Sequence, residues 1–221
     1  MNIDFHAHIL PKADHGSDGL ETSLKQVALA REAGIQILAA TSHFYPGTDT
    51  AEAFLERRTR CFEELTAHLG KDAPEILLGA EVQVCRGLNH LPQISQLCFR
   101  GTNVLLLELS RDFRFSQFER TLEALRYDCK LQVVIAHVDR YPDLAAPLLE
   151  EGFMGQLNAS SLCTLFKKKR FYEWIDNGSV VALGSDLHST DTGYSEFLQA
   201  KKKLGSLYGE IMSRTQTLLG R

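Results

Sequence analysis

Ile3-Asp4-Phe5-His6-Ala7-His8 opens a short apolar run and places two histidines two residues apart. On an extended strand, residues i and i+2 point to the same face, so the two imidazoles lie close enough to hold one metal ion. A His-x-His pair alone is a weak signal, because two histidines on an edge strand are usually solvated. The case for a metal site therefore depends on where the other histidines and acidic residues fall.

Seven apolar runs alternate with helical stretches along the chain. Strands that alternate with helices indicate parallel pairing, because the chain must cross back between them. Runs that are apolar almost throughout are typical of strands buried on both faces. The pattern predicts an α/β fold and fits a (β/α) barrel of about seven strands better than an open sheet, although periodicity alone does not decide between them. The runs cover residues 3–9, 35–41, 76–80, 104–107, 131–136, 153–157 and 180–184.

Composition predicts one globular domain spanning residues 1–221, with 44% hydrophobic and 24% charged residues. We expect no transmembrane helix, because no run of about 18 apolar residues occurs, and no secretory signal is visible. Five widely spaced cysteines without a CxxC motif indicate reduced thiols in a cytoplasmic protein, mostly in the core. The net charge of −4 argues against nucleic acid as a partner.

Local signals place the helix ends. Asp18, Asp49 and Ser116 each stand three residues before a glutamate, which is typical of a capping box. Gly34 follows the first helix and is predicted to end it. A later helix, rich in aromatic residues that include Phe166, is predicted to end at Asn177-Gly178, and one or two helices close the chain from residue 194.

Ligand-type side chains follow six of the seven runs. The carboxyl ends of barrel strands converge at one mouth, so these residues are predicted to meet there. Taken singly, a carboxylate could pair with an arginine, a histidine could be a hydrogen-bonded core residue, and Asp186 could cap a helix. Together, so many ionisable groups at the ends of apolar strands would cost several kcal/mol each without compensation, which divalent cations supply. The nine candidates are His6, His8, His15, His43, Glu81, Glu108, His137, Asp186 and His188, whereas His68 and His90 are predicted to lie on the surface.

The number and kind of ligands indicate more than one ion, since a single zinc takes about four ligands. Shared carboxylates hold ions about 3.5–4 Å apart, a spacing that suits phosphoryl transfer. The nitrogen and oxygen set without thiolate suits manganese, iron or zinc.

Five motifs together resemble the polymerase-and-histidinol-phosphatase (PHP) superfamily: HAHILP at 6–11, ATSH at 40–43, GAEV at 79–82, AHVDRY at 136–141 and GSDLH at 184–188. Within it they are similar to the manganese-dependent tyrosine phosphatases of bacterial capsule and exopolysaccharide operons. The resemblance covers Ile3 to about His188. It implies a distorted (β/α)7 barrel with two to three metal ions, manganese first and iron or zinc as alternatives.

By position, the resemblance implies three ligand sets: His6, His8, Glu81 and Asp186 for one ion, Glu81, Glu108 and His137 for a second, and His15, His43 and His188 for a third. It also implies that Arg140 binds the phosphate, where its forked guanidinium suits two phosphoryl oxygens. The alternative for Arg140 is a surface ion pair with Asp139 or Asp143. Arg140, Glu108 and His43 are the predicted catalytic residues.

Three positions depart from the family pattern. His15 stands where the family usually has an aspartate, Phe44 and Tyr45 follow His43 where basic residues are common, and the loop 189–193 lacks a frequent arginine. The last two changes reduce positive charge around the phosphate. The mouth loops offer three candidates to restore it: Lys12, Arg111 and Arg114.

The resulting hypothesis is hydrolysis of a phosphomonoester by a metal-bridging hydroxide that attacks phosphorus in line, with no covalent enzyme intermediate. The predicted substrate is a phosphotyrosyl protein, in particular a bacterial tyrosine kinase. A thiolate mechanism is not predicted, because no C-x5-R motif occurs. The alternatives left open are histidinol phosphatase or another small-molecule phosphoesterase, a metal-dependent nuclease, and an inactive barrel that binds a partner.

Overall fold

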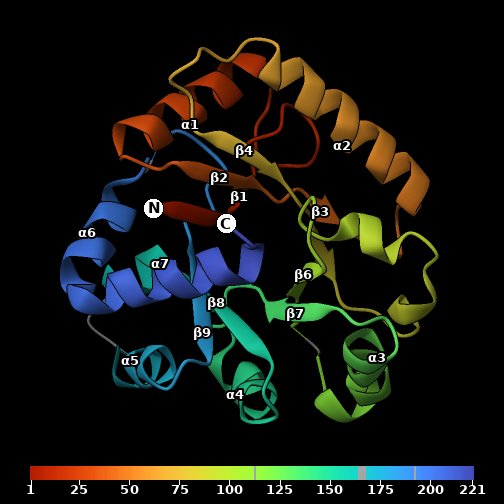
Figure 1. The fold of residues 1–221 in the computed structure, drawn as a ribbon. Helices are drawn as coiled ribbons and strands as arrows, with labels where there is room; N and C mark the ends of the chain where they lie inside the picture. The colour runs from red at the N-terminus through yellow and green to blue at the C-terminus, as the bar shows by residue number, and fades with distance from the viewer. Residues whose placement is uncertain (112, 164–167, 192) are drawn as a thin grey trace.

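Parallel strands lie at the centre of the molecule and helices surround them (Figure 1). The computed structural model describes residues 1–111, 113–163, 168–191 and 193–221, so Phe166 and part of the loop 189–193 lie outside the described residues. The strands of the described chain are β1 (Ile3–Ala7), β2 (Ile37–Ala40), β3 (His43–Phe44), β4 (Glu75–Leu78), β5 (Glu81–Gln83), β6 (Val104–Glu108), β7 (Gln132–Ile135), β8 (Met154–Asn158) and β9 (Val180–Gly184).

Each of the seven predicted apolar runs contains a strand, and the pairings among these strands are parallel. The sheet orders are β1-β2-β4 and β3-β5-β6-β7-β8-β9. Strands β3 and β5 were not predicted. They continue β2 and β4 after two-residue interruptions, across which Gly79 N donates to Ala40 O at 2.9 Å and Glu81 N donates to Ser42 O at 3.1 Å. The described residues therefore form seven parallel strand units, as the sequence predicted.

The segment that follows β9 pairs with β1. Asp186 N donates to His6 O at 2.8 Å, and His8 N donates to Leu187 O at 3.0 Å. These bonds join the first and last strand units, so the arrangement is consistent with the distorted (β/α)7 barrel. They also bring residues 180 positions apart in the chain to the same strand ends.

Helices cover the outside of the strands (Figure 1). Helix α7 packs on β9, where Thr215 Oγ1 donates to Val181 O at 2.7 Å. Two helices close the chain, as predicted, and the region from 84 to 100 holds only short 3-10 turns. The helices of the described chain are α1 (Leu20–Glu32), α2 (Ala51–Thr66), α3 (Phe115–Tyr127), α4 (Pro142–Glu150), α5 (Lys168–Asp176), α6 (Ser195–Leu204) and α7 (Ser206–Leu219).

The predicted helix starts are close, but the predicted capping residues are wrong. The N-cap of α2 is Thr50, whose Oγ1 accepts from Ala53 N at 3.2 Å. Asp49 pairs with Arg57 instead. The N-caps of α1 and α3 are Gly19 and Arg114, without a side-chain capping bond. Gly34 does follow α1, with the left-handed φ of 76° that glycine favours at a helix end.

A continuous apolar core lies between the strands and the helices. Phe5 of β1 packs on Phe99, with ring centroids 4.5 Å apart. Cysteines were predicted to lie mostly in the core, but only Cys61 and Cys98 are buried there, and the other three are partly exposed. No helix in the described ranges has the length and apolar character needed to cross a bilayer. The strands are packed in this core, and polar side chains lie at their carboxyl ends.

Candidate metal centre

Eight of the nine predicted ligands meet at the carboxyl ends of the strands. His6 comes from β1, His8 directly follows β1, His43 comes from β3 and Glu81 from β5. Glu108 ends β6, and three further ligands lie just beyond strands: His137 after β7, and Asp186 and His188 after β9. His68 and His90 are exposed, as predicted. The strand topology therefore gathers the side chains that the sequence scatters over the whole chain.

Glu81 lies at the centre of the cluster and is 1% exposed. Its Oε2 lies 3.2 Å from His6 Nε2, 3.3 Å from His8 Nε2 and 2.9 Å from His43 Nδ1. Despite these short distances, Glu81 Oε2 and His43 Nδ1 have no hydrogen-bond partner among the described residues. A buried carboxylate oxygen without a hydrogen bond is costly, so these atoms need either a bound cation or protonated histidines beside them.

His6 and His8 direct the lone pairs of their Nε2 atoms to the same point. His8 Nδ1 lies 2.7 Å from Asp14 Oδ2, and His6 Nδ1 lies 3.1 Å from Gln156 Oε1. Both partners are acceptors, so each ring carries its hydrogen on Nδ1 when it is neutral. The lone pairs of the two Nε2 atoms then face each other at 3.1 Å beside Glu81. Only a cation or an added proton relieves this arrangement, and the donor set suits a divalent metal.

A second group surrounds the other oxygen of Glu81. His137 Nε2 lies 2.8 Å from Glu81 Oε1 and 3.6 Å from Glu108 Oε1. His43 Nδ1 lies 3.9 Å from Glu108 Oε2. Glu81 therefore contacts one group through Oε2 and the other through Oε1.

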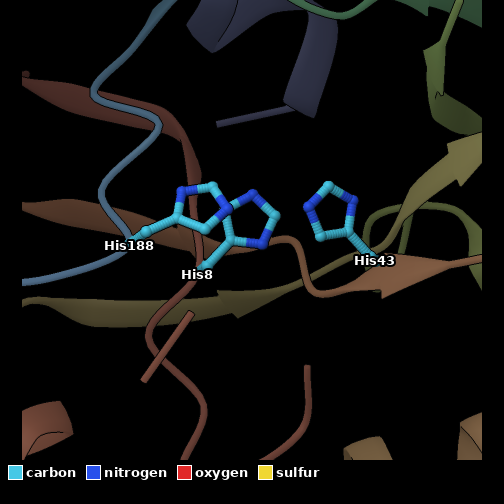
Figure 2. A group of neighbouring side chains, drawn as sticks. All are labelled: His8, His43 and His188. Carbon is cyan, nitrogen blue, oxygen red and sulfur yellow. The ribbon is translucent and has the colours of Figure 1, made fainter. Parts of the chain in front are cut away.

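Ligand atoms of His8, His43 and His188 also lie within 4.8 Å of one another, and Figure 2 shows the three rings together. His8 and His188 stack with ring centroids 3.9 Å apart. His15 is exposed, and its ring stacks on His43 at 4.6 Å. The assignment of His15 to a third ion stays a prediction, and the described geometry places His8 in the group with His43 and His188.

Opposite charges set the protonation of the cluster in the absence of metal. Burial lowers the pKa of His6, but Glu81 and Asp186 outweigh it and raise that pKa. Burial raises the pKa of Glu81, but His6 and His137 outweigh it and hold that pKa well below its usual range. Burial and the nearby Glu81 raise the pKa of Glu108. Burial and the nearby His8 lower the pKa of His188 to about 4.

Arg140 lies at the rim with its side chain 41% exposed. Its Nη2 donates to Asp186 Oδ2 at 2.7 Å, and its Nη1 lies 3.6 Å from Glu108 Oε1. Arg140 therefore faces the cluster and pairs with Glu108 and Asp186, whereas its binding of the phosphate stays a prediction. Of the three compensating cations proposed from sequence, Arg111 donates to Tyr141 OH at 3.3 Å, whereas Arg114 donates to Phe113 O and Lys12 is exposed.

Backbone strain and close packing fix several ligands. His137 and Asp186 have φ values of 30° and 55°, in the left-handed region that residues other than glycine seldom adopt. Gly184 and Gly16 pack against the two ligands of the first strand. A Cβ on Gly184 would lie 2.5 Å from His6 Cβ, and one on Gly16 would lie 2.3 Å from His8 Cβ.

The side chains that hold the ligands were not predicted from the sequence. Asp14 stands in the mouth loop, and its carboxylate also accepts from His43 N at 2.8 Å and Gly16 N at 2.9 Å. Gln156 falls within a run that is otherwise apolar, although it is 0% exposed. A glutamine inside a strand buried on both faces needs partners, and this was the available signal.

A family model described as capsular polysaccharide synthesis, CpsB/CapC, matches residues 2–219. Tyrosine-protein phosphatase CpsB from Streptococcus pneumoniae is 24% identical over 223 residues, which cover 94% of this chain and 91% of the relative. A solved structure from work on YwqE of Bacillus subtilis and CpsB of Streptococcus pneumoniae, described as metal-dependent tyrosine phosphatases, gives a TM-score of 0.76 at 20% identity, covering 98% of this chain and 94% of that chain. Dihydropyrimidinase from Brevibacillus agri shares the fold more distantly, with a TM-score of 0.52 at 12% identity over 93% of this chain and 60% of that chain.

Proposed function

Because the chain belongs to the CpsB/CapC family of capsular polysaccharide synthesis, we propose that it is a metal-dependent protein-tyrosine phosphatase formed by one domain over residues 1–221. The name of the relative from Streptococcus pneumoniae supports a phosphotyrosyl protein as substrate. Its partner in the cell would be a tyrosine kinase of capsule or exopolysaccharide synthesis. The proposed location is the cytoplasm, which suits a chain whose five cysteines are free thiols.

One observation carries this proposal. Three atoms that donate electron pairs to metals, His6 Nε2, His8 Nε2 and Glu81 Oε2, converge within 3.1–3.3 Å of one another in a buried site. Neither core packing nor a helix cap explains such a cluster, because each of these atoms needs positive charge beside it. Divalent cations satisfy all three at once.

The same residues suggest how the ions are held. His6, His8, Glu81 and Asp186 would bind one ion, and Glu81, Glu108 and His137 a second. His43 and His188, with His15 stacked beside His43, would hold a third. Manganese is the expected metal, with iron or zinc as alternatives, and such ions lower the pKa of water and stabilise negative charge on phosphoryl oxygens.

The residues at the rim would orient the substrate. Arg140 presents a half-exposed guanidinium beside the cluster, where its two Nη groups can each donate to a phosphoryl oxygen. The contacts with Glu108 and Asp186 hold this guanidinium over the strand ends. The ring of Tyr45 stacks on His43 with centroids 5.1 Å apart, so an aromatic surface borders the cluster and could contact a phenyl leaving group. A phenolate is a good leaving group and needs little help from an acid.

The test compares two substrates with the metal-loaded protein. Phosphotyrosyl peptide and histidinol phosphate are incubated with wild type and His6→Ala in the presence of Mn²⁺, and phosphate release is measured. We expect wild type to prefer the phosphotyrosyl peptide and His6→Ala to lose at least two orders of magnitude of kcat/KM. Preference for histidinol phosphate would favour the small-molecule alternative, and equal turnover by His6→Ala would contradict the metal site.

A further inference from the structure

Strand β8 ends at the mouth without supplying a predicted metal ligand. Two of its side chains are nevertheless buried beneath the cluster: Gln156 is 0% exposed and Asn158 is 7% exposed. Because successive residues of a strand alternate between faces, residues 156 and 158 point to the same side. Their hydrogen bonds reach three of the proposed ligands, and the donor and acceptor of each bond can be assigned.

The direction begins at the backbone of His137. His137 N lies 2.7 Å from Gln156 Oε1, and a backbone N–H can only donate, so the atom it meets must be the amide oxygen. The same oxygen lies 3.1 Å from His6 Nδ1, which must then carry a hydrogen in the neutral ring. Gln156 therefore leaves the Nε2 lone pair of His6 to face Glu81.

The chain of bonds continues to the opposite side of the cluster. Gln156 Nε2 donates to Asn158 Oδ1 at 3.0 Å, which turns the Asn158 Nδ2 group toward Asp186 Oδ2 at 2.9 Å. Arg140 donates to the same oxygen. With Oδ2 occupied by two donors, Asp186 presents Oδ1, which lies 3.5 Å from His8 Nε2 and 3.7 Å from His6 Nε2.

We infer that Gln156 and Asn158 form a positioning pair that selects the ligating atoms of His6 and Asp186 and anchors His137. The anchor matters because His137 and Asp186 are the two ligands with left-handed φ, and strained residues persist only where their surroundings hold them. Val138 N also donates to the backbone oxygen of Gln156 at 3.0 Å, so Gln156 holds the 137–138 segment twice. This inference rests on the proposed metal-dependent function.

A purely structural role for the pair predicts a different result. Buried amides often satisfy each other, and losing such a pair lowers stability without changing what a nearby site binds. A positioning role predicts weaker metal binding, because partners behind a ligand typically contribute about 10–100-fold to metal affinity. The two roles are therefore separated by metal affinity and by the tautomer of His6, not by stability.

The experiment uses Gln156→Met and Asn158→Leu, each close in size to the original residue, with Thr215→Val as the control. Thr215 is equally buried, but its hydrogen bond lies on α7, away from the cluster. Mn²⁺ affinity is measured by titration calorimetry on protein first freed of metal. The tautomer of His6 is read from imidazole ¹⁵N shifts in the metal-free protein, at a pH where the ring is neutral.

We expect both site variants to bind Mn²⁺ about 10–100-fold more weakly, and Gln156→Met to lose the Nδ1–H tautomer of His6. Gln156→Glu, which keeps the acceptor oxygen, is expected to keep this tautomer. Thr215→Val is expected to lose stability but to bind Mn²⁺ as wild type does. If wild type binds Mn²⁺ and both site variants bind it equally well, the positioning pair is wrong while the proposed function stands. If wild type itself binds no divalent metal, the proposed function fails first.

Discussion

Gly184→Ala tests whether the first ligand strand depends on close packing against the end of β9. The added Cβ would lie 2.5 Å from His6 Cβ and 2.7 Å from Gln156 Nε2. Carbon atoms in contact are normally about 3.5–4.0 Å apart, so His6 or the β9 backbone must move by roughly 1 Å. The backbone of Gly184 is not in the left-handed region, so the effect of alanine comes from this contact and not from φ.

Overpacking of a buried site typically costs about 1–3 kcal/mol. For a chain of this size, about 1 kcal/mol shifts Tm by about 2–4 °C, so we expect a fall of roughly 2–12 °C in the metal-free protein. Displacement of a ligating group by about 1 Å is large for a preorganised site, so Mn²⁺ affinity should fall by about 10–100-fold, which corresponds to about 1.4–2.7 kcal/mol.

The assay pairs scanning calorimetry of the metal-free protein with Mn²⁺ titration. Gly209→Ala is the matched control, because Gly209 lies within α7 and a Cβ added there would meet nothing within 4 Å. Alanine in a helix is more stable than glycine by roughly 0.5–1 kcal/mol, so this variant should melt slightly higher and bind Mn²⁺ unchanged. Wild-type Tm and wild-type affinity in Gly184→Ala would refute the packing argument.

Three further perturbations separate metal binding, support of the ligands and substrate orientation. Removal of metal by a chelator should lower Tm, because a ligand at about 100 times its Kd stabilises the fold by about 2.7 kcal/mol. At about 2–4 °C per kcal/mol, the expected fall in Tm is roughly 5–11 °C. An unchanged Tm when Mn²⁺ is added back to metal-free protein would count against the site. Asp14→Asn should weaken Mn²⁺ binding by about 10-fold or more, because asparagine is a weaker hydrogen-bond acceptor for His8 Nδ1 and can turn its NH2 group toward that nitrogen. Calorimetric titration with Mn²⁺ measures the affinity. An unchanged affinity would show that Asp14 does not support His8. Arg140→Ala should lower kcat/KM for p-nitrophenyl phosphate by about 10²–10³, as the loss of one charge-stabilising donor does in other enzymes. The metal content, measured by mass spectrometry, should stay at the wild-type value. Full activity of this variant would show that Arg140 does not act on the substrate.

Much of the fold could be predicted from the sequence because its signals are local. An apolar run marks a buried strand wherever it occurs, so all seven runs contain strands. The interrupted units were harder. β3 and β5 are short and carry His43 and Glu81, so no apolar run marks them, and their existence depends on pairing with neighbours. Helix capping failed for a related reason, because several polar residues near each start compete for the backbone, and tertiary contacts such as the pairing of Asp49 with Arg57 decide among them.

The convergence of the proposed ligands could be predicted because seven of the nine lie in recognisable motifs at strand ends and Glu108 directly follows an apolar run. The residues that support the ligands could not. Gln156 contacts His6 across 150 residues and His137 across 19 residues, and no spacing rule connects them. The sequence predicts Gly184 at the end of a strand, but only the folded structure shows that it packs against His6. At two positions where the family commonly has basic residues, the structure shows what replaces them. Phe44 is a core residue at 1% exposure, and Tyr45 stacks on His43.

The resemblance noted in the motifs is confirmed by the family model, which extends beyond them to residues 2–219. The motifs at 6–11, 40–43 and 136–141 supply the four histidines that surround Glu81 of the motif at 79–82. The motif at 184–188 supplies Asp186 and His188 beside them. The order of ligands along the chain and their order around the strands therefore agree.

The central claim is that Glu81 bridges divalent cations held by the surrounding histidines. The most direct measurement is an X-ray experiment on crystals soaked in Mn²⁺, with data collected near the manganese edge. We expect at least two anomalous peaks, one between Glu81 and the Nε2 atoms of His6 and His8, the other between Glu81 and His137. A map without anomalous density at Glu81, from crystals in which the soaked ion binds elsewhere, would contradict it.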